Sequence, residues 1–386
     1  MKLSDRVAAN TLAFVLAGGA GRRLDPLTRY RPKPLVPFGG YFRILDFALS
    51  NCLNSELDRV YVLTQHEREA MAAYLRKGWS RVGGFDEFAV ASPALNGKRY
   101  AGTADALLQN IAHLQKHRRL FALVISADHV YKMDYRTLLN FHASSAADVT
   151  IATVDQPGAN GVRTVPVNMG VYVFNYETLL GMLPSDGAQC IDIDIDLIPR
   201  LLRSHRVNTY RHADRTTGKT LYWRDVDTLE AYYAACMDLL EADLKMDPYG
   251  DIWPIRSCSG ARFGRSFLLE AGAESDVNSL IPQAVNISGA SVYRSVLSPG
   301  VVLESGADVR HSVLLPGAVI RRGAVVRNAI IDAHVIIEAW DNVGYSRGAD
   351  QTRFRVLPNG VAIVSPDHIS PFIKVNAPGT VVELNR

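Results

Sequence analysis

The chain reads Phe14-Val15-Leu16-Ala17-Gly18-Gly19-Ala20-Gly21-Arg22-Arg23-Leu24 near its start, and Lys33-Pro34 follows nine residues later. An apolar run that breaks into three glycines predicts a buried strand ending in a tight loop. Glycine lets the backbone approach a bulky anion because it has no Cβ. The amides of such a loop can bind phosphate, and Arg23 and Lys33 add positive charge. Phosphate chemistry is the first hypothesis, and a plain glycine turn beside incidental arginines is the alternative.

Two common nucleotide-binding motifs do not fit this loop. The dinucleotide-binding fingerprint requires a third glycine where this chain has Leu24. The P-loop requires a glycine five positions before Gly-Lys-Thr, and Ala213 stands at that position before Gly218-Lys219-Thr220. A phosphate-binding role for the loop therefore implies a different fold from either.

Length and composition predict an ordinary globular protein. With 386 residues, 48% of them hydrophobic and 21% charged, the chain can form two domains with sizeable cores. A net charge of +3 gives no reason to expect nucleic acid or a membrane surface as a partner. The four cysteines are far apart and have no zinc-site spacing. We see no apolar run of signal-peptide or membrane-spanning length and expect a cytoplasmic location.

Short apolar runs alternate with helical patterns over the first half of the chain. This alternation predicts an α/β domain with a mainly parallel sheet. Ligands bind beyond the carboxyl ends of the strands in such sheets, so we expect the glycine loop and Asp128 at the same edge. The predicted strands are 12–17, 59–63, 121–126 and 148–154, and the predicted helices are 45–55, 67–77 and 104–117.

The end of the chain changes to an internal repeat. Helical periodicity stops after about Leu244, and from about residue 285 the sequence repeats itself. Ser295–Val302 is echoed 17 residues later by Ser312–Val319, and Ala329–Ile336 follows after a further 17. Valines recur every six residues from Val313 to Val325. Apolar residues at six-residue steps, three steps to a turn, predict a parallel β-helix, with a plain antiparallel β-domain as the alternative.

A Gly-Thr turn before the 104–117 helix suits a nucleotide. Helix N-termini favour anions, and Gln109, one turn inside the helix, has the amide needed to pair with a base edge. In the simpler interpretation, Thr103 caps the helix and Asp105 complements its dipole.

Two carboxylates are candidates for binding Mg²⁺. Asp128 ends the 121–126 strand, and Asp225 precedes a helical pattern at 227–244. The alternatives are a turn-forming role for Asp128 and a helix-capping role for Asp225 or Asp227. The predicted strand 168–174 directs its polar end, at Asn168, toward the same edge.

These patches together resemble the sugar-nucleotide pyrophosphorylases, and specifically the bacterial ADP-glucose pyrophosphorylase (glucose-1-phosphate adenylyltransferase) family. The resemblance covers nearly the whole chain. It is carried by Leu16–Leu24, Lys33-Pro34, Phe38–Cys52, Gly78-Trp79, Gly102–Asp105, Asp128–Tyr135, Tyr222–Val226 and Trp253–Arg256. It implies a nucleotidyltransferase-type α/β domain over 1–245, a linker over 246–284 and a left-handed parallel β-helix over 285–386.

The resemblance also implies a role for each matching residue. Catalytic roles fall on Arg23, Lys33 and Asp128, with Arg23 and Lys33 on the leaving pyrophosphate. Mg²⁺ would be held by Asp128 and Asp225. The residues expected to bind the nucleotide are Leu16, Ala17, Gly18, Gly19, Gly21, Gln65, Gly102, Thr103 and Gln109. Those expected to bind the sugar phosphate are Tyr100, Asn168, Tyr172 and Trp223.

Three departures from the family affect the sugar-phosphate half. A family insert with a Phe-x-Glu-Lys-Pro motif, whose lysine binds the sugar phosphate, is reduced here to Asp155–Val167, and Glu-Lys-Pro occurs nowhere in the chain. The family's Asp-Phe-Gly-Lys-Asp segment reads Asp192-Ile193-Asp194-Ile195-Asp196, which removes a second lysine. Asn168 replaces an expected serine. Losing lysine contacts to a dianionic phosphate weakens binding, and Arg163 is a candidate replacement.

The resemblance implies adenylyl transfer from ATP to α-D-glucose 1-phosphate, giving ADP-glucose for glycogen synthesis. One alternative is a catalytically weak or inactive regulatory subunit of a mixed assembly, and another is a pyrophosphorylase for a different sugar 1-phosphate. We expect a homotetramer or a heterotetramer with a paralogue.

Overall fold

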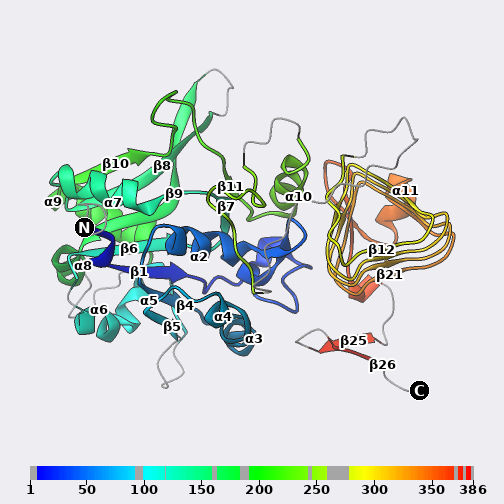
Figure 1. Ribbon diagram of the computed structural model, residues 1–386, viewed down its shortest axis with the longest axis horizontal. Coiled ribbons are helices and arrows are strands. Elements are labelled where there is room, and N and C mark those ends of the chain that lie inside the picture. The colour runs from blue at the N-terminus through cyan, green and yellow to red at the C-terminus, as the bar shows by residue number, and fades with distance from the viewer. Residues whose placement is uncertain are drawn as a thin grey trace. The chain divides into compact units, whose positions relative to one another are not determined.

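The computed structural model describes residues 7–91, 99–117, 119–158, 163–182, 191–241, 246–258, 278–368, 373–376 and 380–383 (Figure 1). The chain divides into two compact units. The first, called here the sheet unit, consists of Met1–Ala20, Leu45–Trp223 and Trp253–Gly260. The second, called the repeat unit, consists of Gly21–Ile44, Arg224–Ile252 and Ala261–Arg386. The domain limits inferred from the resemblance stay a prediction.

The sheet unit is built on a seven-stranded sheet with the order β10-β8-β9-β6-β1-β4-β5. Strand β9 is antiparallel to both of its neighbours, and the other pairs are parallel, as predicted for a mainly parallel sheet. The predicted strands are confirmed to within four residues at each end. The bounds are β1 Thr11–Leu16, β4 Arg59–Leu63, β5 Glu87–Ala91, β6 Phe121–Ser126, β8 Val149–Pro157, β9 Thr164–Asn175 and β10 Val207–Arg211.

The register brings the carboxyl ends of three strands to one edge. Leu16 lies beside Leu63 of β4 and beside Ser126 of β6. Beyond the strands, the Ala17 amide donates to the Leu63 carbonyl at 2.8 Å, and the Ala127 amide donates to the Leu16 carbonyl at 3.1 Å. The glycine loop and Asp128 therefore start at the same edge, as the sequence predicts.

Helices cover the sheet between these strands. The predicted helix 104–117 is divided at Asn110, whose Nδ2 donates to the Ala106 carbonyl at 2.7 Å and to the Tyr100 hydroxyl at 2.9 Å. The helices of the sheet unit are α2 Ile44–Asn54 (Ile44 itself belongs to the repeat unit), α3 Arg68–Tyr74, η3 Leu75–Trp79, α4 Ser80–Val82, α5 Thr103–Gln109, α6 Ile111–His117, α7 Tyr135–Ser144, α8 Tyr176–Met182, η4 Ile193–Leu197 and α9 Ile198–Ser204. The short strand β7, His129–Tyr131, follows β6.

One core of the sheet unit lies under helices α5, α8 and α9. It joins alternate side chains of the central strands, such as Leu12, Phe14 and Val124, to Leu107 of α5 and Leu201 of α9. These side chains are fully buried because alternate residues of a strand face the same side of a sheet. This packing holds the strand ends that carry the candidate site.

The repeat unit contains the coil that the 17-residue echo predicts. Val296, Val313 and Ile330 pair in register on one sheet, and Val302, Val319 and Ile336 pair on a second. The described pairs of the coil are parallel except at its end, where Arg355–Val356 pairs antiparallel with Ala362–Val364. The antiparallel alternative is therefore wrong for the repeat itself, and the chain forms the left-handed parallel β-helix drawn in yellow to orange in Figure 1. Its strands are β12 Asn286–Ile287, β13 Ser291–Tyr293, β14 Val296–Leu297, β15 Val302–Leu303, β16 Asp308–Arg310, β17 Val313–Leu314, β18 Val319–Ile320, β19 Val325–Arg327, β20 Ala329–Ile331, β21 Ile336–Ile337, β22 Asn342–Val343, β23 Arg355–Val356 and β24 Ala362–Val364.

The remaining elements are short. Helix α10, Leu229–Asp238, begins later than the predicted helix at 227–244, and residues 242–245 lie outside the described residues. The others are η1 Arg22–Leu24, η2 Lys33–Leu35, β2 Pro37–Phe38, β3 Phe42–Arg43, β11 Trp223–Asp225, α11 Arg347–Gln351, η5 Pro366–His368, β25 Ile373–Asn376 and β26 Thr380–Glu383. No helix in the described part of the chain is long and apolar enough to cross a membrane.

Gly344→Ala is expected to destabilise the coil by about 3 kcal/mol or more. Gly344 has φ +72°, and a Cβ there would lie 1.5 Å from the Arg327 carbonyl oxygen. Gly360→Ala separates the steric clash from the backbone strain. Gly360 also has positive φ (+87°), but no described atom lies within 4 Å of a Cβ at this position. Urea unfolding monitored by circular dichroism measures both. Equal losses in the two variants would contradict the steric explanation.

His212→Gln is expected to flatten the acid side of the stability profile. Burial lowers the pKa of His212 to about 4 from an ordinary 6.5, so the folded state holds the ring neutral. The unfolded chain binds the extra proton between these values, and stability is therefore complete above pH 6.5 and falls by ~3 kcal/mol as the pH drops to 4. Thermal melts of both proteins from pH 4 to 8 measure this. Parallel profiles would contradict the assignment.

Candidate nucleotide and sugar-phosphate site

The glycine loop is fixed to two neighbouring segments of the sheet unit. Gln65, just after β4, donates from Nε2 to the Gly18 carbonyl at 3.1 Å and accepts at Oε1 from the Tyr100 amide at 2.8 Å. Burial raises the pKa of Tyr100, so its hydroxyl stays protonated. Leu16 and Ala17 lead from the strand into the loop, and at Gly19 no described atom lies within 4 Å of a Cβ. The structure thus brings Gly18, Gln65 and Tyr100 together beside an uncrowded backbone.

The second half of the loop belongs to the repeat unit and lies against Lys33. Gly21 has φ +62°, and a Cβ there would come within 2.7 Å of the Lys33 Cβ, so only glycine fits this turn. The Lys33 ammonium is buried and lies 2.8 Å from Asp227 Oδ1, and the exposed Arg23 also forms an ion pair with Asp227. An anionic ligand on Lys33 or Arg23 would compete with this carboxylate.

Asp227 is therefore the counter-ion of two predicted catalytic cations. The capping alternative for Asp225 and Asp227 is wrong, because Thr228 caps α10 and accepts from the Ala231 amide at 3.1 Å. Asp225 lies exposed in β11 of the repeat unit. No sequence signal distinguished the ion-paired Asp227 from a cap, since both roles place an acid before a helix.

The Gly-Thr turn packs closely against the segment before η4. Gly102 occupies the capping position of α5, and a Cβ there would lie 2.4 Å from the Ile191 carbonyl oxygen. The expectation that Thr103 caps the helix is wrong, because its Oγ1 accepts from the Ile193 amide at 2.8 Å and donates to Asp192 at 3.0 Å. The Thr103 hydroxyl is used across the turn and not along the helix.

Gln109 is held within its own helix. Its Nε2 donates to Asp105 Oδ2 at 3.0 Å, and the same oxygen accepts from the Ala101 amide at 2.7 Å. Asp105 lies in the first turn of α5, as the dipole argument predicts. The contacts of Gln109 in the structure are therefore intrahelical.

Asp128 lies in a tight turn at the sheet edge. The Ser126 hydroxyl donates to Asp128 Oδ1, and His129 Nε2 lies 3.4 Å from the same oxygen. Gly170 of β9 has φ +66° and packs against this turn, since a Cβ there would come within 2.9 Å of Ser126 Cβ. The Asp128 side chain keeps 33% of its surface exposed. An exposed carboxylate on a close-packed turn can accept a ligand without moving the fold.

Trp223 borders this turn from the other side. Its ring centroid lies 4.8 Å from that of His129, and the side chain is buried. The indole Nε1 has no hydrogen-bond partner among the described residues. A buried donor without a partner is costly, and a ligand oxygen would satisfy it.

The residues predicted for the sugar phosphate converge on an acid that the sequence interpretation missed. Asp194 Oδ1 accepts from the Tyr172 hydroxyl at 2.6 Å and from Asn168 Nδ2 at 2.8 Å. Burial and the hydrogen bond to Asp194 raise the pKa of Tyr172. The available signal was the position of Asp194, which stands where the family motif has glycine. The structure thus places a carboxyl group beside the residues predicted to bind the sugar phosphate.

Two segments of this chain differ from the family where the lysines are expected. Ile195, at the position of the second lysine, leaves 77% of its surface exposed. Strands β8 and β9 form a hairpin in which Pro157 pairs with Thr164, and Arg163 lies at its end. Asn168 lies five positions after Arg163 along the extended chain, a span of ~17 Å at ~3.4 Å per residue. The replacement of the missing lysine by Arg163 stays a prediction. Residues 159–162 lie outside the described residues.

Comparison with known proteins agrees with this architecture. A nucleotidyl transferase family model matches residues 12–164, and a model of the GlmU-like C-terminal hexapeptide matches residues 264–364. A glucose-1-phosphate adenylyltransferase of Koribacter versatilis is 33% identical over 399 residues, with 93% of this chain and 96% of that protein covered. Glucose-1-phosphate adenylyltransferase 2 of Alkalilimnicola ehrlichii is 36% identical, with 94% and 95% covered.

The similarity extends over both units. A third relative, a glucose-1-phosphate adenylyltransferase of Methylococcus capsulatus, is 34% identical over 401 residues, again with 94% of this chain and 95% of that protein covered. Matches of this length include the glycine loop, the Asp128 turn and the coil together. The chain therefore belongs to the glucose-1-phosphate adenylyltransferase family of nucleotidyltransferases.

Proposed function

We propose that this chain transfers the adenylyl group of ATP to α-D-glucose 1-phosphate, giving ADP-glucose and pyrophosphate for glycogen synthesis. The observation that carries the proposal is the cluster of Gly18, Gln65 and Tyr100 at the strand edge from which Asp128 also emerges. The relatives, which are named for this reaction, support it.

The reaction requires no protein nucleophile. A phosphate oxygen of the sugar 1-phosphate attacks the α-phosphorus of ATP, the new O–P bond forms, and the bond to the β-phosphate oxygen breaks, so that pyrophosphate leaves with its electron pair. Positioning and charge stabilisation therefore supply the catalysis. The uncrowded backbone at Gly19 would face the ATP phosphates, with Leu16, Ala17, Gly102, Thr103 and Gln109 lining the nucleotide. Arg23 and Lys33 would exchange Asp227 for the departing pyrophosphate.

Asp128 fits a magnesium ion, with Asp225 as a second proposed ligand. In the described residues no group of three or more His, Cys, Asp or Glu side chains is placed to hold a metal. That agrees with Mg²⁺, which commonly takes one or two carboxylates and completes its shell with phosphates and water. When bound, Mg²⁺ neutralises phosphate charge and orients the phosphates.

A regulatory subunit of low activity is the second candidate. Its support is the acid at Asp194 and the exposed Ile195 where the family has a lysine. The glycine loop and Asp128, in contrast, are intact. For both candidate functions we propose a tetramer, formed by this chain alone or together with a paralogue. Light scattering of the purified chain tests this.

Pyrophosphate release from the purified full-length chain tests substrate choice. ATP with glucose 1-phosphate is expected to give the highest kcat/KM among UTP, GTP and dTTP and among other sugar 1-phosphates. Release only with another pair would move the chain to a different pyrophosphorylase. ATP binding without release from any pair would favour the regulatory subunit.

A further inference from the structure

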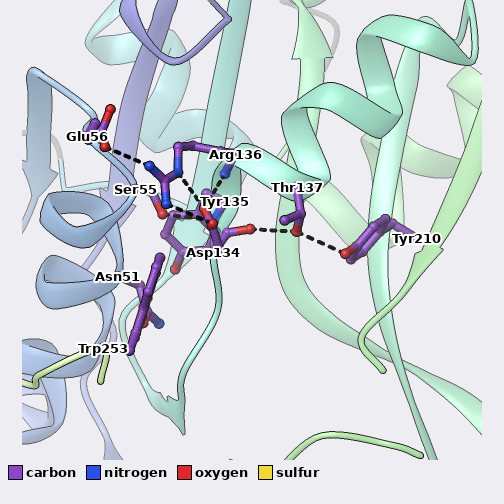
Figure 2. A network of polar contacts seen from close by, with 9 residues as sticks. All are labelled: Asn51, Ser55, Glu56, Asp134, Tyr135, Arg136, Thr137, Tyr210 and Trp253. Carbon is purple, nitrogen blue, oxygen red and sulfur yellow. Dashed lines mark hydrogen bonds and ion pairs between the residues drawn. The ribbon is translucent and has the colours of Figure 1, made fainter. Parts of the chain in front are cut away.

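Helix α2 carries a face of buried polar side chains within the sheet unit. Ser50 and Asn51 of this face are fully buried, as is Ser55 directly after the helix, and Asn54 lies beside them. Buried polar groups are kept where each finds a hydrogen-bond partner. The partners here come from two segments, the stretch 131–135 after Asp128 and the stretch 253–256 (Figure 2).

Asn51 is the side chain that bonds to both segments. Its Nδ2 donates to the Tyr131 carbonyl at 3.2 Å, and its Oδ1 accepts from the Met133 amide at 3.1 Å. The same Oδ1 accepts from Trp253 Nε1 at 2.8 Å, and Figure 2 shows the indole beside Asn51. Two backbone groups two residues apart are thus fixed by one amide, which is in turn fixed by the indole.

The turn that holds Asp128 lies between two such fixed points. On one side the Ala127 amide is bonded to the Leu16 carbonyl of β1 at 3.1 Å. On the other side Asn51 holds Tyr131 and Met133. Only residues 128–130 lie between them, which links the position of the Asp128 turn to the bonds of Asn51.

Among the described residues, the neighbouring side chains Ser50 and Asn54 of α2, and Ser55 directly after it, each bond to one of these two segments. Ser55 Oγ accepts from the Tyr135 amide at 2.8 Å, at the start of α7. Asn54 Nδ2 donates to the Pro254 carbonyl at 3.0 Å, and Ser50 Oγ accepts from the Arg256 amide at 2.8 Å. These residues provide controls that differ from Asn51 only in what they hold.

Trp253 adopts a backbone conformation that is unusual for a bulky residue. Its φ of +61° lies in the left-handed region, which costs energy for any residue with a Cβ. Such a conformation persists where surrounding contacts impose it. Here the Pro254 and Arg256 bonds to α2 follow directly, and the indole donates to Asn51.

We propose that Asn51 is a positioning residue for the Asp128 carboxylate and that Trp253 supports it by holding the Asn51 amide in place. The role in the reaction rests on the proposed function of Asp128. The positioning itself concerns only the fold of the sheet unit and can be measured without substrate. Residues 253–256 are thereby coupled to the turn at the sheet edge.

Two measurements on the full-length chain test the proposal. Hydrogen exchange followed by mass spectrometry, without nucleotide or metal, reports on the amides of 127–135. Steady-state rates give kcat, the KM for ATP and the Mg²⁺ concentration for half-maximal rate. Asn51→Ala is expected to speed exchange at Met133 at least tenfold and to raise the Mg²⁺ requirement several-fold. Trp253→Phe, which removes only the indole donor, is expected to change both in the same direction by a smaller factor.

Asn54→Ala is the matched control. It removes a polar side chain from the same helix and one bond to the 253–256 segment, but it leaves the Ser50 bond to Arg256 and the indole bond to Asn51 in place, so exchange at 127–135 is expected to change less than in Trp253→Phe. Equal changes in Asn54→Ala and Asn51→Ala would overturn the proposal, since the effect would then be general loosening. If Asn51→Ala does not fold, Trp253→Phe decides, and unchanged exchange at 127–135 in that variant overturns it. An inactive parent chain with the expected exchange pattern would instead count against the proposed function.

Discussion

Asp128→Asn is expected to lower kcat for ADP-glucose formation about a thousandfold. Asparagine keeps the size of the side chain and can still interact with Ser126 and His129, so the turn should remain folded. It removes the negative charge that attracts a divalent cation to the transferring phosphate. Binding of ATP to the glycine loop should change much less than kcat. Coupled pyrophosphate release and calorimetric titration of ATP measure the two effects.

Asp148→Asn provides the control for this prediction. The Asp148 side chain is exposed to a similar degree, 27%, and bonds to the Arg206 amide away from the strand ends that carry the candidate site. Its replacement should leave kcat within about twofold, since surface changes away from a site are small. A thousandfold loss in both variants, or in neither, would remove Asp128 from the proposed chemistry.

Ile195→Lys is expected to lower the KM for glucose 1-phosphate by roughly tenfold or more. Ile195 is exposed in η4, directly after the acid that bonds to Tyr172 and Asn168. A hydrogen bond between ammonium and phosphate contributes ~1.5–3 kcal/mol, which corresponds to about 10- to 150-fold in affinity. The KM for ATP should not change, since the lysine is expected on the sugar side. Initial rates over a matrix of both substrates separate the two constants.

Leu202→Lys controls for charge alone. Leu202 is 63% exposed on the neighbouring helix α9, so its replacement adds the same positive charge outside the pocket. If both lysines lower the KM equally, long-range attraction and not a local contact is responsible. No change with Ile195→Lys would show that the sugar phosphate lies elsewhere.

The sequence predicts the parts of this structure that have regular patterns. Buried strands such as Phe121–Ser126 are unbroken apolar runs, and the 17-residue echo around Val313 becomes the register of the coil. The need for glycine in the loop after such a run is also predictable, and at Gly21 only glycine fits beside Lys33. These features depend on residues that are close together in the chain, so a single sequence is enough to predict them.

Contacts between distant residues are not visible in the same way. Asn51 is an ordinary polar residue in a helical pattern, and only the folded chain shows that it holds Met133 and Trp253. The predictions of the helix-capping residues were wrong for a related reason. Asp227 and Thr103 each lie near the start of a helix, but their side chains bond to residues distant in the sequence instead of capping it. Local capping rules give one of several available partners, and packing selects among them.

The most direct test of the account is whether the purified chain, with no second protein present, forms ADP-glucose from ATP and glucose 1-phosphate. Chromatography with mass-spectrometric detection identifies the product, and equal amounts of pyrophosphate should be released. We expect formation of ADP-glucose with a high KM for glucose 1-phosphate, because the lysines of the sugar side are absent. Tight ATP binding with no ADP-glucose at any sugar-phosphate concentration would contradict it.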